Sequence, residues 1–266
     1  MNYYIGVDIG GTKIKAVLLS GHERQNIHPV TVDTPKDKRA CIAALQEIVR
    51  SAARDKKIAG IGVGAPGVVD SSRGLIIKCA NLAFLDNIRL ADVFGSFKTP
   101  VRVENDSRCF ILAEAAWGSA MKYKHVVGVA IGTGIGGGIV IDGAIYRGST
   151  NAAGEFGHTI FQIAEHDSRA PKEYSWEQLG SKQTFLNPDE SARVIGIGVA
   201  NIINTLDPEI IVLGGGGIMS GLLKMDRIVK TAREFLISPS ARKTPIKKAS
   251  LGDAAQAIGA ALLGKK

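Results

Sequence analysis

Cysteine is scarce in this chain. Only three cysteines occur among the 266 residues, at Cys41, Cys79 and Cys109, and they lie far apart. This odd number excludes the disulfide framework of a small secreted protein. Long apolar runs are missing as well, since no stretch reaches the roughly 18 apolar residues of a membrane span and the first residues resemble no export signal. We therefore expect a cytoplasmic protein with reduced, buried thiols and no membrane partner.

Aromatic residues make up only 6% of the chain, although its formal net charge is +8. The densest basic stretch, residues 242–248, contains a proline but no aromatic residue. Nucleic-acid surfaces usually combine basic and aromatic side chains, so a solvated loop is the better interpretation. The positive charge suits an anionic ligand such as ATP or polyphosphate without choosing between them. We expect small-molecule partners and no nucleic acid.

Two stretches of the sequence resemble each other. Residues 4–19 and 126–141 each show strand-like alternation on both sides of a glycine turn. Gly6–Gly10 aligns with Gly128–Gly132, an offset of 122 residues (128 − 6). Strand and helix patterns follow each hairpin, and 45% hydrophobic residues suffice for two modest cores. The sequence therefore predicts an α/β protein with two related lobes.

Asp8 is a carboxylate within an apolar strand pattern. An unpaired buried charge costs about several kcal/mol, so Asp8 requires a cation or a donor nearby. One interpretation is that Asp8 holds Mg²⁺, directly or through water, beside a phosphate-binding turn. The alternative is an ordinary hairpin with a surface aspartate. The turn in question consists of Gly10, Gly11, Thr12 and Lys13.

The second glycine turn is Gly132-Thr133-Gly134, and its glycines continue to Gly138. No Gly-Lys-Ser/Thr follows, which excludes a Walker A loop, and the glycines lie between two strands rather than opening a helix, which excludes a dinucleotide fingerprint. Without β-carbons, the backbone here can approach a phosphate closely. A bulged hairpin remains the alternative.

Asp106 follows a short strand pattern and opens a helix pattern that continues to residue 116. Asn105, Asp106 and Ser107 are also residue types that cap helices. A kinase acting on hydroxyl groups requires a carboxylate that accepts the proton, beside a neutral neighbour that orients the acceptor. Asp106 and Asn105 supply this pair, and the sequence leaves the capping and catalytic interpretations both open.

Glu155 and His158 form a Glu-x-x-His pair among small residues. Such a pair can be half of a metal site, but no second half with suitable spacing is present. Hydroxyl groups of a sugar are a better match, because the carboxylate accepts and the imidazole donates hydrogen bonds. Glu177, taken alone, is most simply a solvated helix residue.

Together these motifs resemble the ROK family, which contains bacterial-type glucokinases, other hexose and N-acetylhexosamine kinases, and sugar-responsive repressors. The resemblance runs in order from residue 1 to about residue 260. It implies the actin-like, ribonuclease-H-like fold, with two lobes around a cleft, and a homodimer. We expect one lobe to contain 1–107 and 250–266 and the other to contain 108–249. The motifs are residues 8–13, 64–67, 104–106, 132–138, 153–158 and 213–216.

The same resemblance implies roles for individual residues. Asp106 would be the catalytic base, and the two glycine turns would hold the phosphates. The residues implied to contact or border the sugar are Gly67, Asn81, Asn105, Glu155, His158 and Glu177. Those implied to border the adenosine are Gly214, Gly215 and Gly216.

The chain departs from the family pattern after His158. Many members carry a cysteine-rich segment there that binds structural zinc, whereas residues 159–175 contain no cysteine. We therefore expect no structural zinc. The cofactors that the resemblance implies are ATP and Mg²⁺.

The predicted function is phosphorylation of a hexose, with the glucose 6-hydroxyl as first choice. Mannose, fructose, allose or an N-acetylated hexosamine would require only small changes of the pocket. The donor also remains open, because the resemblance includes relatives that use polyphosphate and the charge of +8 permits it. A sugar-sensing repressor is less favoured, because the first strand begins by Tyr4 and leaves no room for a DNA-binding motif ahead of it. An actin-like ATPase would leave Asn105, Glu155 and His158 without a role.

Overall fold

The computed structural model describes residues 2–20, 29–79, 81–164, 172–181 and 187–265. They form two compact units. Unit 1 consists of residues 1–117, 147–152 and 251–266, and unit 2 of residues 118–146 and 153–250. The stretch 108–117, which we expected from the sequence in the other lobe, belongs to α3 (Asp106–Trp117) and lies in unit 1 because α3 packs along α8 (Ala255–Gly264).

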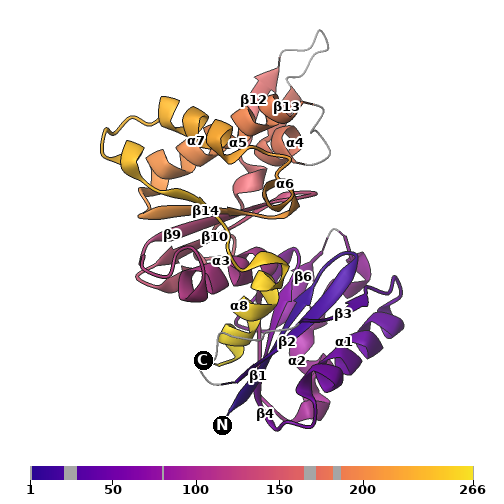
Figure 1. The fold of residues 1–266 in the computed structure, drawn as a ribbon. Coiled ribbons are helices and arrows are strands. Elements are labelled where there is room, and N and C mark those ends of the chain that lie inside the picture. Colours follow the sequence, from indigo (N-terminus) through magenta and orange to yellow (C-terminus); the bar gives the residue numbers. More distant parts are fainter. Residues whose placement is uncertain (1, 21–28, 80, 165–171, 182–186, 266) are drawn as a thin grey trace. The chain divides into compact units, whose positions relative to one another are not determined.

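Unit 1 contains a five-stranded sheet of order β3-β2-β1-β4-β8 (Figure 1). The first three strands pair antiparallel, and β1, β4 and β8 run parallel to one another. Alternating apolar side chains place a buried row on one face of each strand. The strands are β1 (Tyr3–Ile9), β2 (Lys13–Ser20), β3 (Val30–Asp33), β4 (Ile58–Ala65) and β8 (Val101–Asn105).

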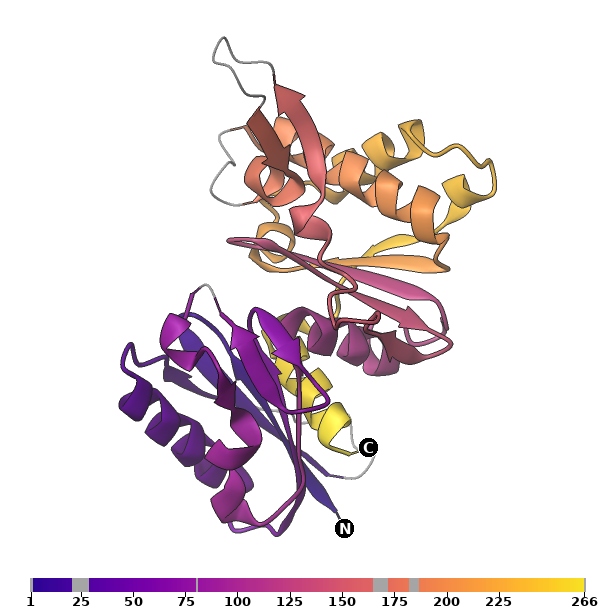
Figure 2. The ribbon, with the colours of Figure 1, turned by 180° about the vertical axis from the view of Figure 1, so that it is seen from behind.

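The two faces of this sheet are covered differently (Figures 1 and 2). On one face, isoleucine and valine side chains pack against the apolar stripe of α1 (Lys38–Ala53). On the other face, glycines allow α8 to lie almost on the strands. A Cβ at Gly6 would lie 1.8 Å from the Ala257 carbonyl oxygen, and one at Gly62 would lie 1.7 Å from that of Ala260. Only glycine fits at these positions.

A smaller sheet, β5-β6-β7, completes unit 1. It comprises β5 (Val68–Asp70), β6 (Leu75–Lys78) and β7 (Ile88–Arg89), followed by the short helix α2 (Leu90–Val93). All three cysteines lie in unit 1 as free, buried thiols, as expected. Burial raises the pKa of the Cys109 thiol well above its usual range, so this thiol is unreactive.

Unit 2 repeats the topology of the first sheet. Its strand order is β11-β10-β9-β14-β15. Strand β10 pairs antiparallel with β9 and β11, and β14 pairs parallel with β9 and β15. This order confirms the internal repeat indicated by the sequence. The strands are β9 (Val126–Ile131), β10 (Ile135–Ile141), β11 (Ala144–Tyr146), β14 (Ile210–Gly214) and β15 (Ile246–Lys248).

Helix α5 (Pro188–Leu206) provides most of the helical side of the unit 2 core. It begins as expected of a capped helix, because the Asn187 side chain accepts from the backbone N–H groups of Asp189 and Glu190 and a proline occupies the first turn. Its partner is α7 (Met225–Glu234). Unit 2 also contains α4 (Trp176–Gly180), α6 (Gly216–Met219) and the 3₁₀ turns η3 (Phe156–His158) and η5 (Ala241–Lys243).

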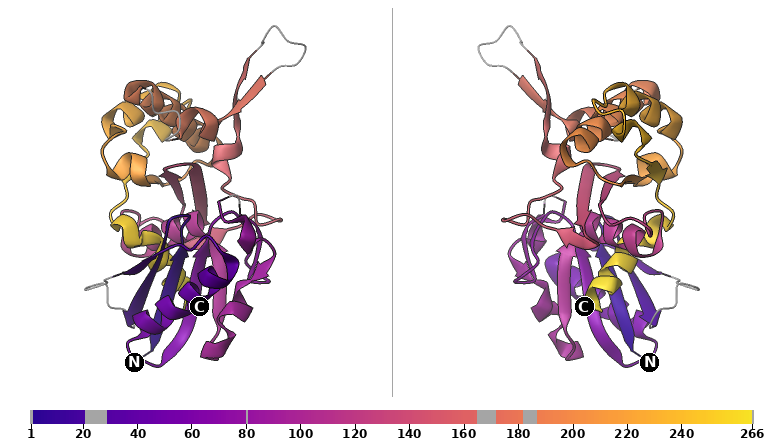
Figure 3. Two further views of the ribbon diagram at one scale, coloured as in Figure 1. Left: turned by 90° about the vertical axis from the view of Figure 1, so that its right-hand side faces the viewer. Right: turned by 90° about the vertical axis from the view of Figure 1, so that its left-hand side faces the viewer.

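Residues 159–175, where many family members carry zinc-binding cysteines, contain two antiparallel strands, β12 (Ile160–Ala164) and β13 (Lys172–Ser175). The two strands extend away from the helices of unit 2 (Figure 3). At their base, the rings of Phe161 and Trp176 stack with centroids 5.7 Å apart. In the described part of the chain, every helix is too short or too polar to cross a bilayer.

Candidate functional site

Asn105 and Asp106 lie at the junction of β8 and α3. Asn105 is the residue that caps the helix, since its Oδ1 accepts from the backbone N–H groups of Ser107 at 2.9 Å and Arg108 at 3.2 Å. Asp106 is the first residue of α3 and is only partly buried. Its Oδ1 accepts from Ser107 N at 2.7 Å. Asn105 therefore serves as the cap, and Asp106, beside it, remains the candidate base.

Gly67 and Asn105 are brought together, as the predicted sugar-side residues of unit 1 should be. Asn105 Nδ2 donates to the Gly67 carbonyl oxygen at 3.1 Å, which leaves one amide hydrogen for a ligand. Gly67 has φ +83°, and a Cβ there would lie 2.2 Å from the Lys78 carbonyl oxygen. Asn81 lies beside the first glycine turn, because a Cβ on Gly11 would come within 3.6 Å of the Asn81 Cβ.

Asp8 lies near Asp106 and carries an altered acidity. Burial raises its pKa to about 7, and the negative charge of Asp106 contributes in the same direction. Lys15, its cross-strand partner on β2, opposes this shift. Lys15 is itself bound to Asp253, with Nζ 2.7 Å from Oδ2. The surroundings of Asp8 and Asp106 are therefore short of positive charge.

This donor set fits a divalent cation. Mg²⁺ in kinases is usually held by one or two carboxylates together with water and the phosphates of the substrate. Asp8 offers such a carboxylate, and a cation bound to it would relieve its repulsion with Asp106. No group of three or more acidic, histidine or cysteine side chains suited to a metal is found among the described residues. A site that shares the ion with a phosphate ligand is consistent with this finding.

The first glycine turn has its carbonyl groups occupied. Thr34 Oγ1 donates to Gly10 O at 2.7 Å, Thr34 N donates to Thr12 O at 2.9 Å, and Lys36 Nζ donates to Gly11 O at 2.5 Å. Gly10 N donates within the turn to Lys13 O at 3.0 Å. The N–H groups of Gly11 and Thr12 make no hydrogen bond to any described residue. These donors remain available for an anion.

The second glycine turn, in unit 2, has space for a side chain at one glycine and none at another. A Cβ at Gly132 would meet no atom within 4 Å, whereas one at Gly134 would lie 2.4 Å from Glu177 Oε2. The Glu177 carboxylate accepts from Ile135 N at 2.7 Å. The predicted sugar contact Glu177 therefore supports the backbone of this turn, a role for which the sequence holds no signal.

The Gly214–Gly216 loop adjoins the same turn. Gly215 has φ +82°, and a Cβ there would lie 2.4 Å from the Ile131 carbonyl oxygen, at the end of β9. The loop that follows β14 therefore packs directly on the strand that leads into Gly132. The structure thus brings together the two segments of unit 2 that were implied to bind the nucleotide.

Glu155 and His158 lie at the two ends of η3, with Oε2 and Nε2 4.0 Å apart. Both side chains are solvent-accessible, at 43% and 72% of their full exposure. Glycines seat this turn on β10, because a Cβ at Gly157 would lie 2.3 Å from the Ile135 carbonyl oxygen. Helix α4, which carries Glu177, also packs on η3.

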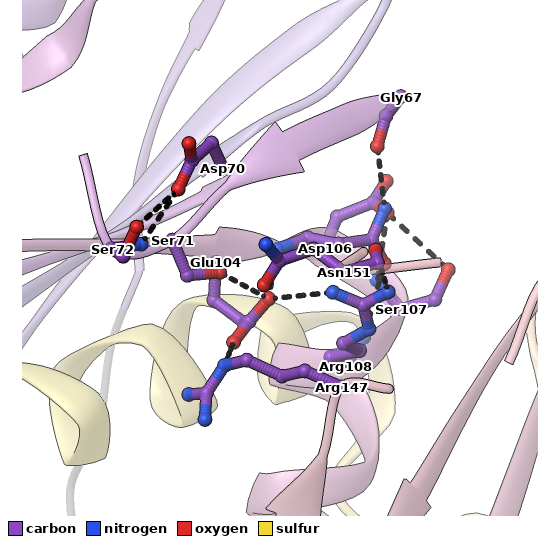
Figure 4. A network of polar contacts seen from close by, with 11 residues as sticks. Gly67, Asp70, Ser71, Ser72, Glu104, Asp106, Ser107, Arg108, Arg147 and Asn151 are labelled. Atoms are coloured by element: carbon purple, nitrogen blue, oxygen red, sulfur yellow. Dashed lines mark hydrogen bonds and ion pairs between the residues drawn. The ribbon is translucent and has the colours of Figure 1, made fainter. Parts of the chain in front are cut away.

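Sequence reasoning missed a buried ionic network beside the Asn105–Asp106 pair (Figure 4). Glu104 is fully buried, and its Oε1 lies 3.1 Å from Arg108 Nη1 while its Oε2 lies 2.6 Å from Arg147 Nε. Ser71 Oγ donates to Glu104 Oε1 at 2.9 Å. Arg108 Nη2 donates to the Asn151 carbonyl oxygen at 2.6 Å. The i, i+4 spacing of Glu104 and Arg108 on a strand–helix junction was the one available signal.

Comparisons with known proteins cover the whole chain. A model of the ROK family matches residues 4–188 and 179–266. The chain is 31% identical over 307 aligned positions to an N-acetyl-D-glucosamine kinase of Histophilus somni, covering 98% of both proteins. It is 27% identical to a glucokinase of Streptomyces coelicolor, covering 100% of this chain and 98% of that one. The crystal structure of a ROK family glucokinase from Streptomyces griseus with glucose and AMPPNP superposes with a TM-score of 0.85 at 27% identity, covering 99% of each chain.

Proposed function

The chain belongs to the ROK family and has its actin-like fold, and on this basis we propose that it is a sugar kinase that transfers a phosphoryl group from ATP to a hexose hydroxyl. The observation that carries the proposal lies within unit 1. There the partly buried Asp106 and the cation-deficient Asp8 adjoin a glycine turn with unused N–H donors. A base, a cation site and a phosphate cradle are the parts that phosphoryl transfer requires.

We propose that Asp106 accepts the proton of the attacking hydroxyl group as it approaches the γ-phosphoryl group. Asn105 orients the acceptor through its remaining amide hydrogen, while its other contacts hold Asp106 at the start of α3. Mg²⁺ bound at Asp8 would offset the charge of the phosphates. The exposed pair Glu155 and His158 is proposed to bind the hydroxyl groups of the sugar, since the two side chains offer an acceptor and a donor.

Glucose is our first proposal for the acceptor, and N-acetyl-D-glucosamine is the second. The glucokinase structure with glucose and the glucokinase of Streptomyces coelicolor support the first proposal. The 31% identity to an N-acetyl-D-glucosamine kinase supports the second. The two sugars differ in one substituent, so the contacts of the pocket with that substituent decide between them.

The test is a coupled assay of ADP release from ATP, run over a panel of glucose, N-acetyl-D-glucosamine, mannose, fructose and allose. We expect one sugar to give the highest kcat/KM and little release of ADP without sugar. Formation of sugar phosphate from polyphosphate in a parallel assay tests the donor. ADP release that no sugar stimulates would support the actin-like ATPase instead, and sugar binding without turnover would support a sensor.

Three further properties stay predictions from the sequence: the homodimer, the cytoplasmic location and the independence from zinc. Zinc independence has a direct test. A chelator that strips zinc should leave the melting temperature and, with Mg²⁺ in excess, the activity unchanged, because the Phe161–Trp176 stack anchors the hairpin base. A loss of either after chelation would contradict the prediction.

A further inference from the structure

Unit 1 contains a cavity of about 360 Å³ on the α8 side of the edge strand β8. Its volume is within the range of about 300–1,000 Å³ that is typical of small-molecule sites. None of the residues proposed above for catalysis, sugar or nucleotide lines it. The lining residues are Ser71, Ser72, Arg102, Val103, Arg147, Asn151 and Leu263.

Arg147 presents unused donors to this cavity. Its Nε donates to Glu104 at 2.6 Å, which fixes the plane of the guanidinium group. The two Nη groups lie on the side away from Glu104 (Figure 4) and make no hydrogen bond to a described residue. The side chain is 37% exposed, so these four N–H donors are reachable from solvent. A guanidinium group held on one edge and open on the other is prepared to bind an anion through a fork of two hydrogen bonds.

Arg102 adds a second unpaired cation. Residues two apart on a strand point to the same face, so Arg102 lies on the face of β8 that carries Glu104. Arg102 is exposed and has neither a hydrogen bond nor an ion pair with any described residue.

The charges around the cavity do not balance. Arg102 and Arg147 are the charged residues that line it, and no carboxylate is among the lining residues, so the lining carries a charge of +2. Glu104 lies behind Arg147 and is shared with Arg108. Asp70, beside Ser72, does not compensate for this excess. Its Oδ1 is occupied by donors of its own turn, and Arg73 offsets its charge.

We propose that Arg102 and Arg147 bind the phosphate group of a small metabolite in this cavity. A phosphate monoester carries a charge between about −1.5 and −2 near pH 7, which matches the excess of +2, whereas a monocarboxylate would leave half of it uncompensated. Arginine forks match the geometry of phosphate oxygens. Asn151, which lines the same cavity, offers an amide for a further hydrogen bond. This site does not depend on the proposed kinase function.

The experiment is a calorimetric titration of the full chain at constant ionic strength. The probes are inorganic phosphate, glucose 6-phosphate and acetate. The variant is Arg102→Gln, and the matched control is Arg39→Gln, which removes the same charge from an exposed position on α1 outside the cavity. A second variant, Arg147→Lys, keeps the charge but loses the fork.

We expect Arg102→Gln to weaken one phosphate-binding event by about 10- to 100-fold, the value of one charge-assisted contact. Arg39→Gln should bind as wild type does, and Arg147→Lys should be weakened by about tenfold. Binding at the glycine turns would persist in Arg102→Gln, so the two phosphate sites are distinguished by stoichiometry.

Tighter binding of glucose 6-phosphate than of inorganic phosphate identifies an ester as ligand, and the reverse identifies the free ion. Equal binding by Arg102→Gln and wild type, equal binding of acetate, or no binding of either phosphate by wild type would overturn the proposal.

Discussion

Units 1 and 2 share one sheet topology but carry different chemistry at corresponding positions. In both sheets an antiparallel hairpin with a glycine turn is followed by two parallel strands. The strand before the turn carries Asp8 in unit 1 and Ala130 at the aligned position in unit 2. The carboxylates are therefore gathered in unit 1, whereas the turn of unit 2 offers backbone alone. A repeated fold can thus hold two glycine turns while only one unit carries the carboxylates proposed as base and cation site.

The largest effect should follow from removing the base of unit 1. Asp106→Asn should lower kcat by roughly 10²- to 10⁴-fold, because an amide cannot accept the proton, and should leave the melting temperature unchanged. The matched control in unit 2 is Asp207→Asn, at a left-handed position after α5 that asparagine tolerates. Turnover measured at saturating substrates should be unaffected there. If Asp106→Asn retained wild-type turnover, the assignment of the base would be wrong.

The hairpins, the repeat and the strand–helix junction at Asp106 could be predicted from sequence, because each depends on local alternation, on glycine or on a fixed spacing. The packing of α8 on Gly6 and Gly62 could not, since it joins residues 198 to 251 positions apart and leaves no local pattern. The contact of Glu177 with Ile135 is hidden for the same reason. Charge type alone does not say which distant N–H group or arginine a carboxylate will meet.

Gly62 in unit 1 has no space for a side chain, whereas Gly132 in unit 2 has open space at the position of a Cβ. Gly62→Val should destabilise the protein by about 4 kcal/mol or more, because its Cβ would overlap the Ala260 carbonyl oxygen and α8 would have to move. Gly132→Ala should change the free energy of unfolding by less than about 0.5 kcal/mol, since nothing lies within 4 Å. Denaturant melts test both. A raised KM for ATP in Gly132→Ala, at normal stability, would support a phosphate-binding role for this turn.

The ionic network of unit 1 has no counterpart among the described residues of unit 2 that is buried to the same degree. Glu104→Gln should lower the free energy of unfolding by about 3 kcal/mol, because two arginines would then share a neutral amide in a buried position. The exposed acid Glu173→Gln in unit 2 serves as control. Urea denaturation measures both. A Glu104→Gln protein as stable as wild type would show that the network is energetically neutral.

The acidity of Asp8 gives unit 1 a pH dependence that Ala130 cannot give unit 2. The pKa of Asp8 is about 7 in the folded protein against 3.8 for an ordinary aspartate, so the unfolded chain releases this proton first. Stability from this group is therefore complete below about pH 4 and is lost as the pH rises towards 7, on the order of 4 kcal/mol. Mg²⁺ should restore more stability at pH 8 than at pH 5, as measured by thermal melts. Asp8→Asn should abolish both effects, and a variant that keeps them would exclude Asp8 as their source.

The smallest effect concerns Glu177, an acid of unit 2 that touches a glycine turn. Two roles predict different kinetics for Glu177→Gln. If the carboxylate acts by holding Ile135 N, the weaker neutral hydrogen bond should raise KM for ATP by about three- to tenfold and leave KM for the sugar unchanged. If it contacts the sugar, KM for the sugar should rise instead. We expect the first outcome, because Glu177 Oε2 already lies 2.7 Å from Ile135 N at the end of the turn. In that case unit 2 would need this carboxylate to shape its glycine turn and not to take part in the chemistry.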